Sequence, residues 1–180
     1  MKVLETNLEG CLLIEPRIFN DNRGHFLETY NYTRYMELAG LNINFVQDNQ
    51  SLSKKGILRG LHFQKSNPQG KLVSVAYGEV FDVAVDMRPK SKTFGEYFSV
   101  ILDSEKKKQL YVPPGFAHGF YVLSDMAIFN YKCTDYYNPN DEGGIIWNDP
   151  CLNINWPNEC PEISEKDKLL PKFSNLKEIY

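Results

Sequence analysis

Short alternations of apolar and polar residues recur along the chain, and each alternation has the length of a β-strand. In the clearest one, within residues 80–86, one face holds Phe81, Val83 and Val85, and the other holds Asp82, Ala84 and Asp86. A two-residue period is typical of a half-buried strand. The same criterion predicts further strands at 72–77, 96–102, 110–112, 120–123 and 127–137.

Turn-forming residues separate these runs, for example at 88–91 and 138–141, where Pro lies beside Lys, Ser, Asn and Asp. Many short strands without alternating helices indicate an all-β sandwich or barrel of the jelly-roll kind. The length of 180 residues suits a single domain that spans 1–180.

Two short helices are expected at the periphery. One covers 34–39, with Thr33 or Asn31 as its N-cap and Gly40 at its end. The other begins at Ser164, because Ser-Glu-Lys-Asp at 164–167 fits a capping box.

The strand predicted at 127–137 carries unusual side chains for a core. Alternate residues of a barrel strand face inward, so polar groups among them indicate a ligand cavity. The residues of one parity are Phe129, Tyr131, Cys133, Asp135 and Tyr137. We therefore expect two tyrosines and a carboxylate to face one cavity.

Composition and charge exclude several classes of function. Apolar residues make up 42 % and charged residues 24 %, which are ordinary values for a globular protein. The net charge of −3 and the absence of a Lys/Arg stripe argue against nucleic-acid binding. No stretch resembles a signal peptide or has the length of a membrane span.

The four cysteines are irregularly spaced and form no C-x-x-C motif. Together with the missing signal peptide, this spacing predicts reduced thiols in the cytoplasm. Each cysteine is interpreted as a small apolar residue.

Metal and nucleophile chemistries find no support in the motifs. A metal site needs three or four convergent ligands, and the chain has three histidines and no H-x-H, H-E-x-x-H or C-x-x-C. G-x-S-x-G, G-x-G-x-x-G and Walker motifs are also missing. Each histidine taken alone fits a satisfied, half-buried side chain.

Proton transfer to and from carbon requires no such sequence motif. Histidine is a base near neutral pH, and an enolate needs a donor or cation at its oxygen. Inversion also needs a group on the opposite ring face that returns a proton. Tyr, Lys, His and Asp are all available, and composition alone leaves open which of them act.

Several segments, in order along the chain, resemble the dTDP-4-dehydrorhamnose 3,5-epimerase family, whose fold is a cupin-type jelly roll. The resemblance runs from about residue 10 to residue 171. Its motifs are DNRGHF at 21–26, QDNQS at 47–51, RGLHFQ at 59–64, QGKLV at 69–73, DVAVDMR at 82–88, PPGFAHGF at 113–120, YK at 131–132, WNDP at 147–150 and SEKD at 164–167.

The resemblance implies epimerisation of dTDP-4-dehydro-6-deoxy-D-glucose at C3 and C5 without a metal or organic cofactor. His62 is then the base, Asp167 its hydrogen-bonding partner, Tyr131 the acid on the opposite ring face, and Lys71 the cation beside the C4 oxygen. From the residues alone, Asp167 also fits a capping acid, Tyr131 a half-buried strand aromatic and Lys71 a surface lysine.

The resemblance also implies a set of substrate-binding residues and a homodimer. The substrate-binding residues are Arg23, Phe26, Glu28, Gln47, Asp48, Asn49, Arg59, His118, Tyr137, Glu142 and Lys166. Arg23 and Arg59 suit the diphosphate, because a guanidinium binds phosphate oxygens bidentately. Arg23, Phe26 and Glu28 are expected to reach the neighbouring subunit's site. The product is expected to feed dTDP-L-rhamnose synthesis and cell-surface polysaccharide.

One feature of RGLHFQ conflicts with a flat strand. Arg59 and His62 are three residues apart, so a regular strand points them to opposite faces. Both reach one ligand only if Gly60 permits a twist or bulge.

Three other functions are compatible with parts of the sequence. The nearest is a mono-epimerase or ketoisomerase that acts on a related dTDP-keto-sugar. A metal-dependent cupin enzyme and a non-catalytic sugar-nucleotide-binding module are the others.

Overall fold

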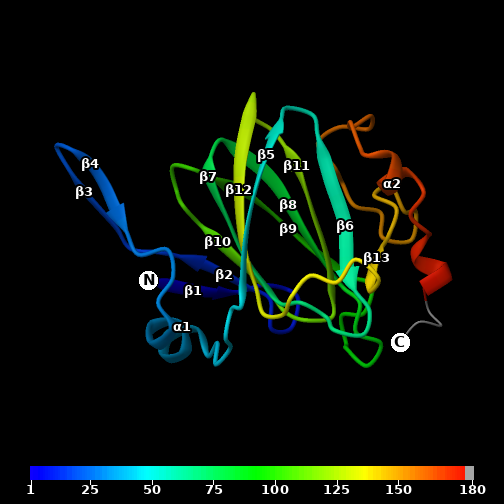
Figure 1. Cartoon of the computed structure of the whole chain (residues 1–180), viewed down its shortest axis with the longest axis horizontal. Coiled ribbons are helices and arrows are strands. Elements are labelled where there is room, and N and C mark those ends of the chain that lie inside the picture. The colour runs from blue at the N-terminus through cyan, green and yellow to red at the C-terminus, as the bar shows by residue number, and fades with distance from the viewer. Residues whose placement is uncertain (177–180) are drawn as a thin grey trace.

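Two antiparallel sheets face each other in the computed structural model, which describes residues 1–176 (Figure 1). The six-stranded sheet has the order β1 (Lys2–Glu5), β2 (Leu12–Glu15), β10 (Gln109–Val112), β7 (Lys71–Tyr77), β12 (Met126–Cys133) and β5 (Gln47–Lys54). The five-stranded sheet has the order β13 (Glu142–Gly144), β6 (Leu58–Gln64), β11 (Phe116–Val122), β8 (Glu79–Asp86) and β9 (Tyr97–Asp103). The predicted all-β sandwich is confirmed. The single-domain prediction stays a prediction, and its last residues, 177–180, lie outside the described part of the chain.

The remaining elements are peripheral. A hairpin of β3 (Ile18–Asp21) and β4 (Gly24–Leu27) extends away from the sandwich on the left of Figure 1. The helices are α1 (Tyr32–Ala39), α2 (Glu165–Lys168) and a final 3-10 turn, η1 (Phe173–Leu176). None of the helices within residues 1–176 is long and apolar enough to cross a membrane.

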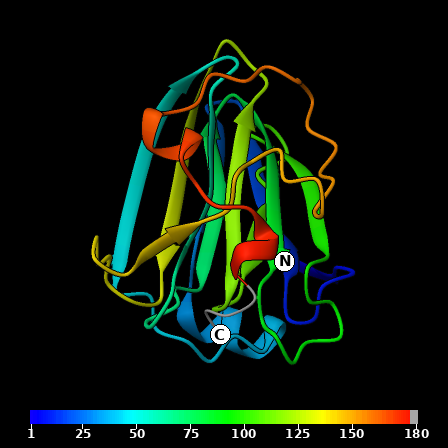
Figure 2. The same ribbon diagram turned by 90° about the vertical axis from the view of Figure 1, so that its right-hand side faces the viewer.

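Apolar side chains fill both faces of the five-stranded sheet. Ala84 on the inner face of β8 belongs to a cluster with Phe129 of the opposite sheet. Val85 on the outer face packs in a second cluster with Trp156 and Phe173 of the C-terminal segment. That segment crosses in front of the five-stranded sheet in Figure 2. Burial on both faces explains why β8 carries almost no exposed residue.

The ends of two predicted strands differ from the prediction. The strand expected at 120–123 is the end of the longer β11. The strand expected at 127–137 ends at Cys133. Beyond it, the Asp135 carboxylate accepts a hydrogen bond from the Tyr136 N–H at 2.7 Å, and such local bonds compete with a strand ladder. The expectation that Asp135 faces the cavity as part of this strand is therefore wrong.

Strand β5 shows why some elements escape the hydrophobic pattern. Its sequence QDNQSLSK is polar, yet Gln47, Asn49, Ser51 and Ser53 alternate towards the more buried face. The alternation is present but involves polar residues, because this part of the interior is not an apolar core.

Both predicted helices are present. Asn31 caps α1 by accepting from the Arg34 N–H at 3.1 Å, and Gly40 ends it with a left-handed φ of 66°. Helix α2 has only four residues, and Ser164 Oγ accepts from the Asp167 N–H at 3.1 Å, as the capping box predicted.

A buried carboxylate fastens the end of β8 to the loop that follows. Asp86 is fully buried and accepts from Arg88 Nη2 at 2.7 Å, Ser91 Oγ at 2.5 Å and Thr93 Oγ1 at 2.7 Å. Burial alone raises the pKa of a carboxyl group, but these donors outweigh it and lower the pKa of Asp86 to about 2. The folded protein therefore holds the Asp86 carboxylate in its ionised form at neutral pH.

We predict that Asp86→Asn destabilises the protein by about 2 kcal/mol at neutral pH, which is the free energy of a pKa depression of this size. A depressed folded-state pKa contributes stability that is present above the ordinary value of 3.8 and is lost as the pH falls through about 2. The difference between variant and wild type should therefore shrink below about pH 4. Urea unfolding from pH 7 to pH 2.5 measures it. Asp125→Asn, in an exposed turn, is the matched control and should change little. Equal destabilisation by both variants contradicts the prediction.

Candidate active site

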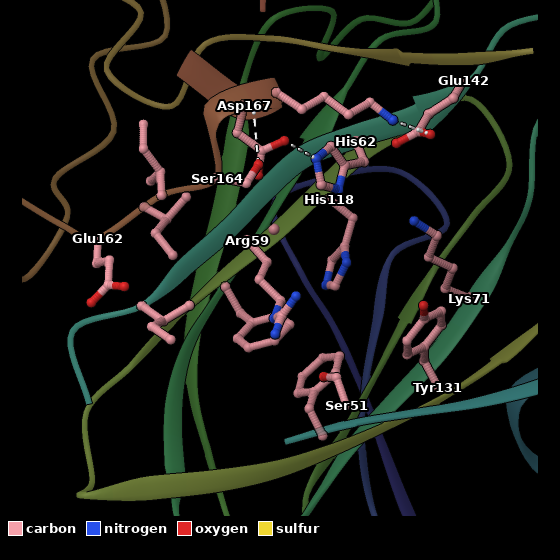
Figure 3. A pocket seen from close by; sticks show the side chains of 17 residues that line it. Ser51, Arg59, His62, Lys71, His118, Tyr131, Glu142, Glu162, Ser164 and Asp167 are labelled. Carbon is pink, nitrogen blue, oxygen red and sulfur yellow. Dashed lines mark hydrogen bonds and ion pairs between the residues drawn. The ribbon is translucent and has the colours of Figure 1, made fainter. Parts of the chain in front are cut away.

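A cavity of about 450 Å³ lies between the two sheets and beside α2 (Figure 3). Strands β6 and β11 form one wall, and β5, β7 and β12 form the other. An adjoining cavity of about 320 Å³ shares His62, Lys71, Tyr131 and Glu142 with it. The two cavities therefore meet at these four polar side chains, and together they are called the cleft.

A bulge in β6 brings Arg59 and His62 to the same cavity. His62 lies opposite His118, and Arg59 lies opposite Phe120, so three steps on β6 match two on β11. At the bulge Gly60 has φ 128°, and a Cβ there would lie 2.6 Å from the Cα of Gly119. Only glycine fits a close backbone approach in this conformation. The irregularity that the sequence required is present.

His62 is paired with the carboxylate predicted for it. His62 Nε2 lies 2.7 Å from Asp167 Oδ1, and Asp167 is buried at the tip of α2. Burial raises the pKa of this carboxyl group, but hydrogen bonds from His62, Ser164 and the Gly60 backbone outweigh it and hold the pKa below its ordinary value. Because an ionised carboxylate only accepts, Nε2 carries the proton and Nδ1 is left as the basic nitrogen.

Tyr131 and Lys71 extend into the cavity from the six-stranded sheet. Figure 3 shows His62 and Tyr131 on opposite sides of the space, with Lys71 beside Tyr131. Desolvation lowers the pKa of the Lys71 ammonium and raises the pKa of the Tyr131 phenol. Both groups are thus placed to act on a ligand in the cavity.

Glu142 lies at the mouth of the cleft with two other predicted substrate-binding residues, Tyr137 and Lys166. Its Oε2 accepts from Lys166 Nζ and from the Tyr137 hydroxyl, each at 2.6 Å. Burial raises the pKa of Glu142, but these two donors outweigh it and lower the pKa below the ordinary value. Gln47 Oε1 accepts from the Tyr137 N–H at 2.9 Å, so β5 supports the same corner.

Arg59 is held at the cavity by a residue that sequence reasoning missed. Its Nε donates to Ser53 Oγ at 2.8 Å, which leaves both terminal nitrogens for a ligand. Ser51 also lines the cavity, and its Oγ is the one buried side-chain N or O atom without a hydrogen-bond partner among residues 1–176. The alternation of Asn49, Ser51 and Ser53 was the available signal.

Four of the predicted substrate-binding residues lie away from this cavity in a single chain. Arg23 pairs with Asp21 at 2.6 Å on the projecting hairpin. Phe26 is 69 % exposed on the same hairpin, and Glu28 lies 3.4 Å from Arg34 Nε.

The fourth, Asp48, binds Lys132 at 2.8 Å on the outer face of the six-stranded sheet. It lies there because β5 alternates, which directs Asp48 away from its neighbours Gln47 and Asn49. One chain therefore does not bring Asp48 to the cleft.

A second imidazole–carboxylate pair lies deeper in the cavity. His118 Nε2 is 3.0 Å from each oxygen of Asp82, and both side chains are buried. In the part of the chain that the structure describes, no three His, Cys, Asp or Glu side chains are grouped as a metal site. All four cysteines are free.

Comparison with known proteins agrees with this geometry. Residues 5–175 match the family described as dTDP-4-dehydrorhamnose 3,5-epimerase. The epimerase of that name from Salmonella typhimurium is 53 % identical over 173 residues, which cover 95 % of this chain and 94 % of the relative.

Solved structures are equally similar. The dTDP-4-dehydrorhamnose 3,5-epimerase from Elizabethkingia anophelis is 50 % identical with a TM-score of 0.93, covering 100 % of this chain and 99 % of that one. The dTDP-6-deoxy-D-glucose-3,5-epimerase from Legionella pneumophila, in complex with dTDP-4-keto-L-rhamnose, is 51 % identical with a TM-score of 0.89, covering 96 % and 98 %. This chain belongs to the dTDP-4-dehydrorhamnose 3,5-epimerase family.

Proposed function

We propose that this chain epimerises dTDP-4-dehydro-6-deoxy-D-glucose at C3 and C5 to dTDP-4-dehydro-L-rhamnose, in the cytoplasm, for dTDP-L-rhamnose synthesis. The observation that carries the proposal is the pair of His62 and Asp167 facing Tyr131 across one cavity. A base and an acid on opposite faces of the pyranose ring are what inversion at carbon requires.

The first step removes a proton from the carbon beside the C4 carbonyl. His62 Nδ1 takes the proton, the C–H electron pair becomes a carbon–carbon double bond, and the carbonyl oxygen becomes an enolate. Asp167 fixes the tautomer of His62 and stabilises the imidazolium that forms. A positioned base of this kind contributes a rate factor of about 10²–10⁴.

The enolate oxygen needs positive charge, and Lys71 supplies it. Its ammonium makes no hydrogen bond or ion pair with another residue of the described chain, so it is available to a ligand. Its low-dielectric surroundings strengthen the attraction to the developing oxyanion.

Tyr131 then returns a proton to the opposite face of the ring. Because burial raises its pKa, the phenol is protonated at neutral pH and able to donate. Solvent afterwards restores the proton to the tyrosine and removes the one on His62, so the cycle consumes nothing. The two inversions repeat the same transfer at C3 and at C5.

The nucleotide is bound at the mouth of the cleft. The terminal nitrogens of Arg59 suit the diphosphate, and the Tyr137 ring, held by Glu142, offers a face to the thymine. We propose further that the chain forms a homodimer in which Arg23, Phe26 and Glu28 reach the neighbouring site. Their separation from the cavity within one chain supports this arrangement.

A single-site epimerase is the second candidate. The Tyr131 hydroxyl has no hydrogen-bond partner among the described residues, so its reach towards C3 or C5 is not fixed by the protein alone. The same histidine, aspartate and lysine serve a mono-epimerase or a ketoisomerase.

We predict that incubation with dTDP-4-dehydro-6-deoxy-D-glucose in deuterated water introduces deuterium at both C3 and C5, because each inversion exchanges a carbon-bound proton with solvent. Proton NMR measures the loss of both signals and the product configuration. Exchange at C3 alone or C5 alone selects the mono-epimerase, and a binding module gives no exchange.

We predict that His62→Ala and Tyr131→Phe fail in different ways. His62→Ala should lower turnover and exchange by about a hundredfold or more while nucleotide binding is retained, since only the base is lost. Tyr131→Phe should keep exchange, because protonated His62 can exchange with solvent and return a deuteron to the same face, but lose net inversion. The same NMR assay separates exchange from inversion. Loss of both by Tyr131→Phe in a folded protein contradicts the assignment of Tyr131 as the acid.

We predict that two inactive variants complement each other. In a mixture of Arg23→Ala and His62→Ala chains, half of the dimers are mixed and each holds one site with an intact histidine and the neighbour's arginine. Turnover should recover to about a quarter of the wild-type value. Unmixed variants are the controls, and subunit exchange is verified by native mass spectrometry. Exchanged dimers without recovery contradict the shared site.

A further inference from the structure

Asp82 is a buried carboxylate that the proposed reaction does not use. It lies on β8, is fully buried, and has His118 as its hydrogen-bonding partner at 3.0 Å from both oxygens. A buried carboxylate without a donor or positive partner is destabilising by several kcal/mol, so this pairing constrains both side chains. The constraint acts on His118, which lines the cavity directly opposite His62 on the neighbouring strand.

The pairing determines which nitrogen of His118 faces the cavity. Both atoms bonded to Nε2 are carboxylate oxygens that accept, so Nε2 carries a proton. No residue of the described chain bonds to His118 Nδ1. If this nitrogen were fully buried it would be an unpartnered buried atom, but among residues 1–176 Ser51 Oγ is the one such side-chain atom. His118 Nδ1 is therefore reached from the cavity. Figure 3 shows the ring between Arg59 and Lys71.

Burial and an aromatic neighbour limit how far the His118 ring can move if its partner is lost. Phe129 stacks against it with ring centres 6.1 Å apart and an interplanar angle of 25°. Phe129 in turn stacks on Phe120 at 4.2 Å. The orientation of the ring is set by these aromatics, and the position of its proton is set by Asp82.

We propose that Asp82 is a positioning residue for this reaction: it keeps the proton of His118 on Nε2 and so presents Nδ1 to the sugar beside Lys71. The proposal rests on the proposed epimerase function. Asp82 touches no substrate atom and acts through His118. The two His–Asp pairs thus present equivalent ring nitrogens, one from His62 as the base and one from His118 as a substrate contact.

The first test measures the wild-type protein and does not depend on activity. Nitrogen-15 NMR of labelled histidine should show a His118 ring protonated at Nε2, assigned by its loss in His118→Asn. In Asp82→Asn the proton should shift in part to Nδ1, because an amide can donate to Nε2 as well as accept from it. A wild-type ring with an unprotonated Nε2 overturns the proposal even if Asp82→Asn does not fold.

The second test asks whether Asp82 acts through His118. Asp82→Asn should lower turnover about tenfold or more, since misplacing one group at a reacting centre has effects of this size. His118→Asn retains an acceptor, its amide oxygen, near the position of Nδ1 and no longer needs the carboxylate to fix a tautomer. Adding Asp82→Asn to His118→Asn should therefore lower turnover less than twofold further, a non-additivity typical of coupled residues. Additive effects overturn the proposal.

Asp86→Asn is the matched control. It removes a second fully buried carboxylate on the same face of the same strand, but one that bonds Arg88 and not His118. It should lower stability and leave the His118 proton and the turnover at low temperature unchanged. An equal loss of turnover in both variants shows a general effect of destabilisation and overturns the proposal. Wild-type isotope exchange is run alongside: its absence refutes the epimerase function, while the NMR result still decides the role of Asp82.

Discussion

The close approach of two backbones at Gly60 and Gly119 is the constraint on which the site depends. The approach leaves no room for a Cβ and accompanies the extra residue in β6. Without that residue, Arg59 and His62 would lie on opposite faces of the sheet, and the guanidinium would be separated from the imidazole. The same bulge places the Gly60 backbone near Asp167, where it helps to hold the carboxylate ionised. A local departure from regular pairing therefore brings Arg59 and His62 to one cavity.

Charge is arranged around the cleft so that most groups have one defined partner. Asp167 is hydrogen-bonded to His62, and Asp82 to His118. Glu142 accepts hydrogen bonds from Lys166 and Tyr137. Lys71 is the exception. Asp82 and Glu142 interact with it electrostatically at a distance, but it makes no hydrogen bond or ion pair in the described chain. This pattern matches a reaction in which negative charge develops transiently on the substrate.

The sequence predicted the layers of the fold better than the limits of its strands. Apolar alternation located β7, β8 and β9 to within a residue or two, because those strands pack against apolar neighbours. It did not identify β5, whose inward face is polar. It also extended β12 too far, since the local hydrogen bond of Asp135 is invisible to a periodicity argument. In the site, the resemblance named His62, Tyr131 and Lys71, which the cavity brings together. It gave no role to Ser53 or Asp82, because each acts through a partner that only the fold brings near.

The His62–Asp167 bond spans 105 positions of the chain, which has a consequence for synthesis. Domains emerge from the ribosome N-terminal part first, and a nascent chain that ends before α2 already contains every strand of both sheets. Such a chain holds every residue of the inner cluster around Ala84 and Phe129, but it lacks Phe173 of the outer cluster, and its His62 imidazole has no carboxylate to orient it. The outer cluster and the His62–Asp167 pair are thus completed together, when the last segment with its four-residue helix has been made.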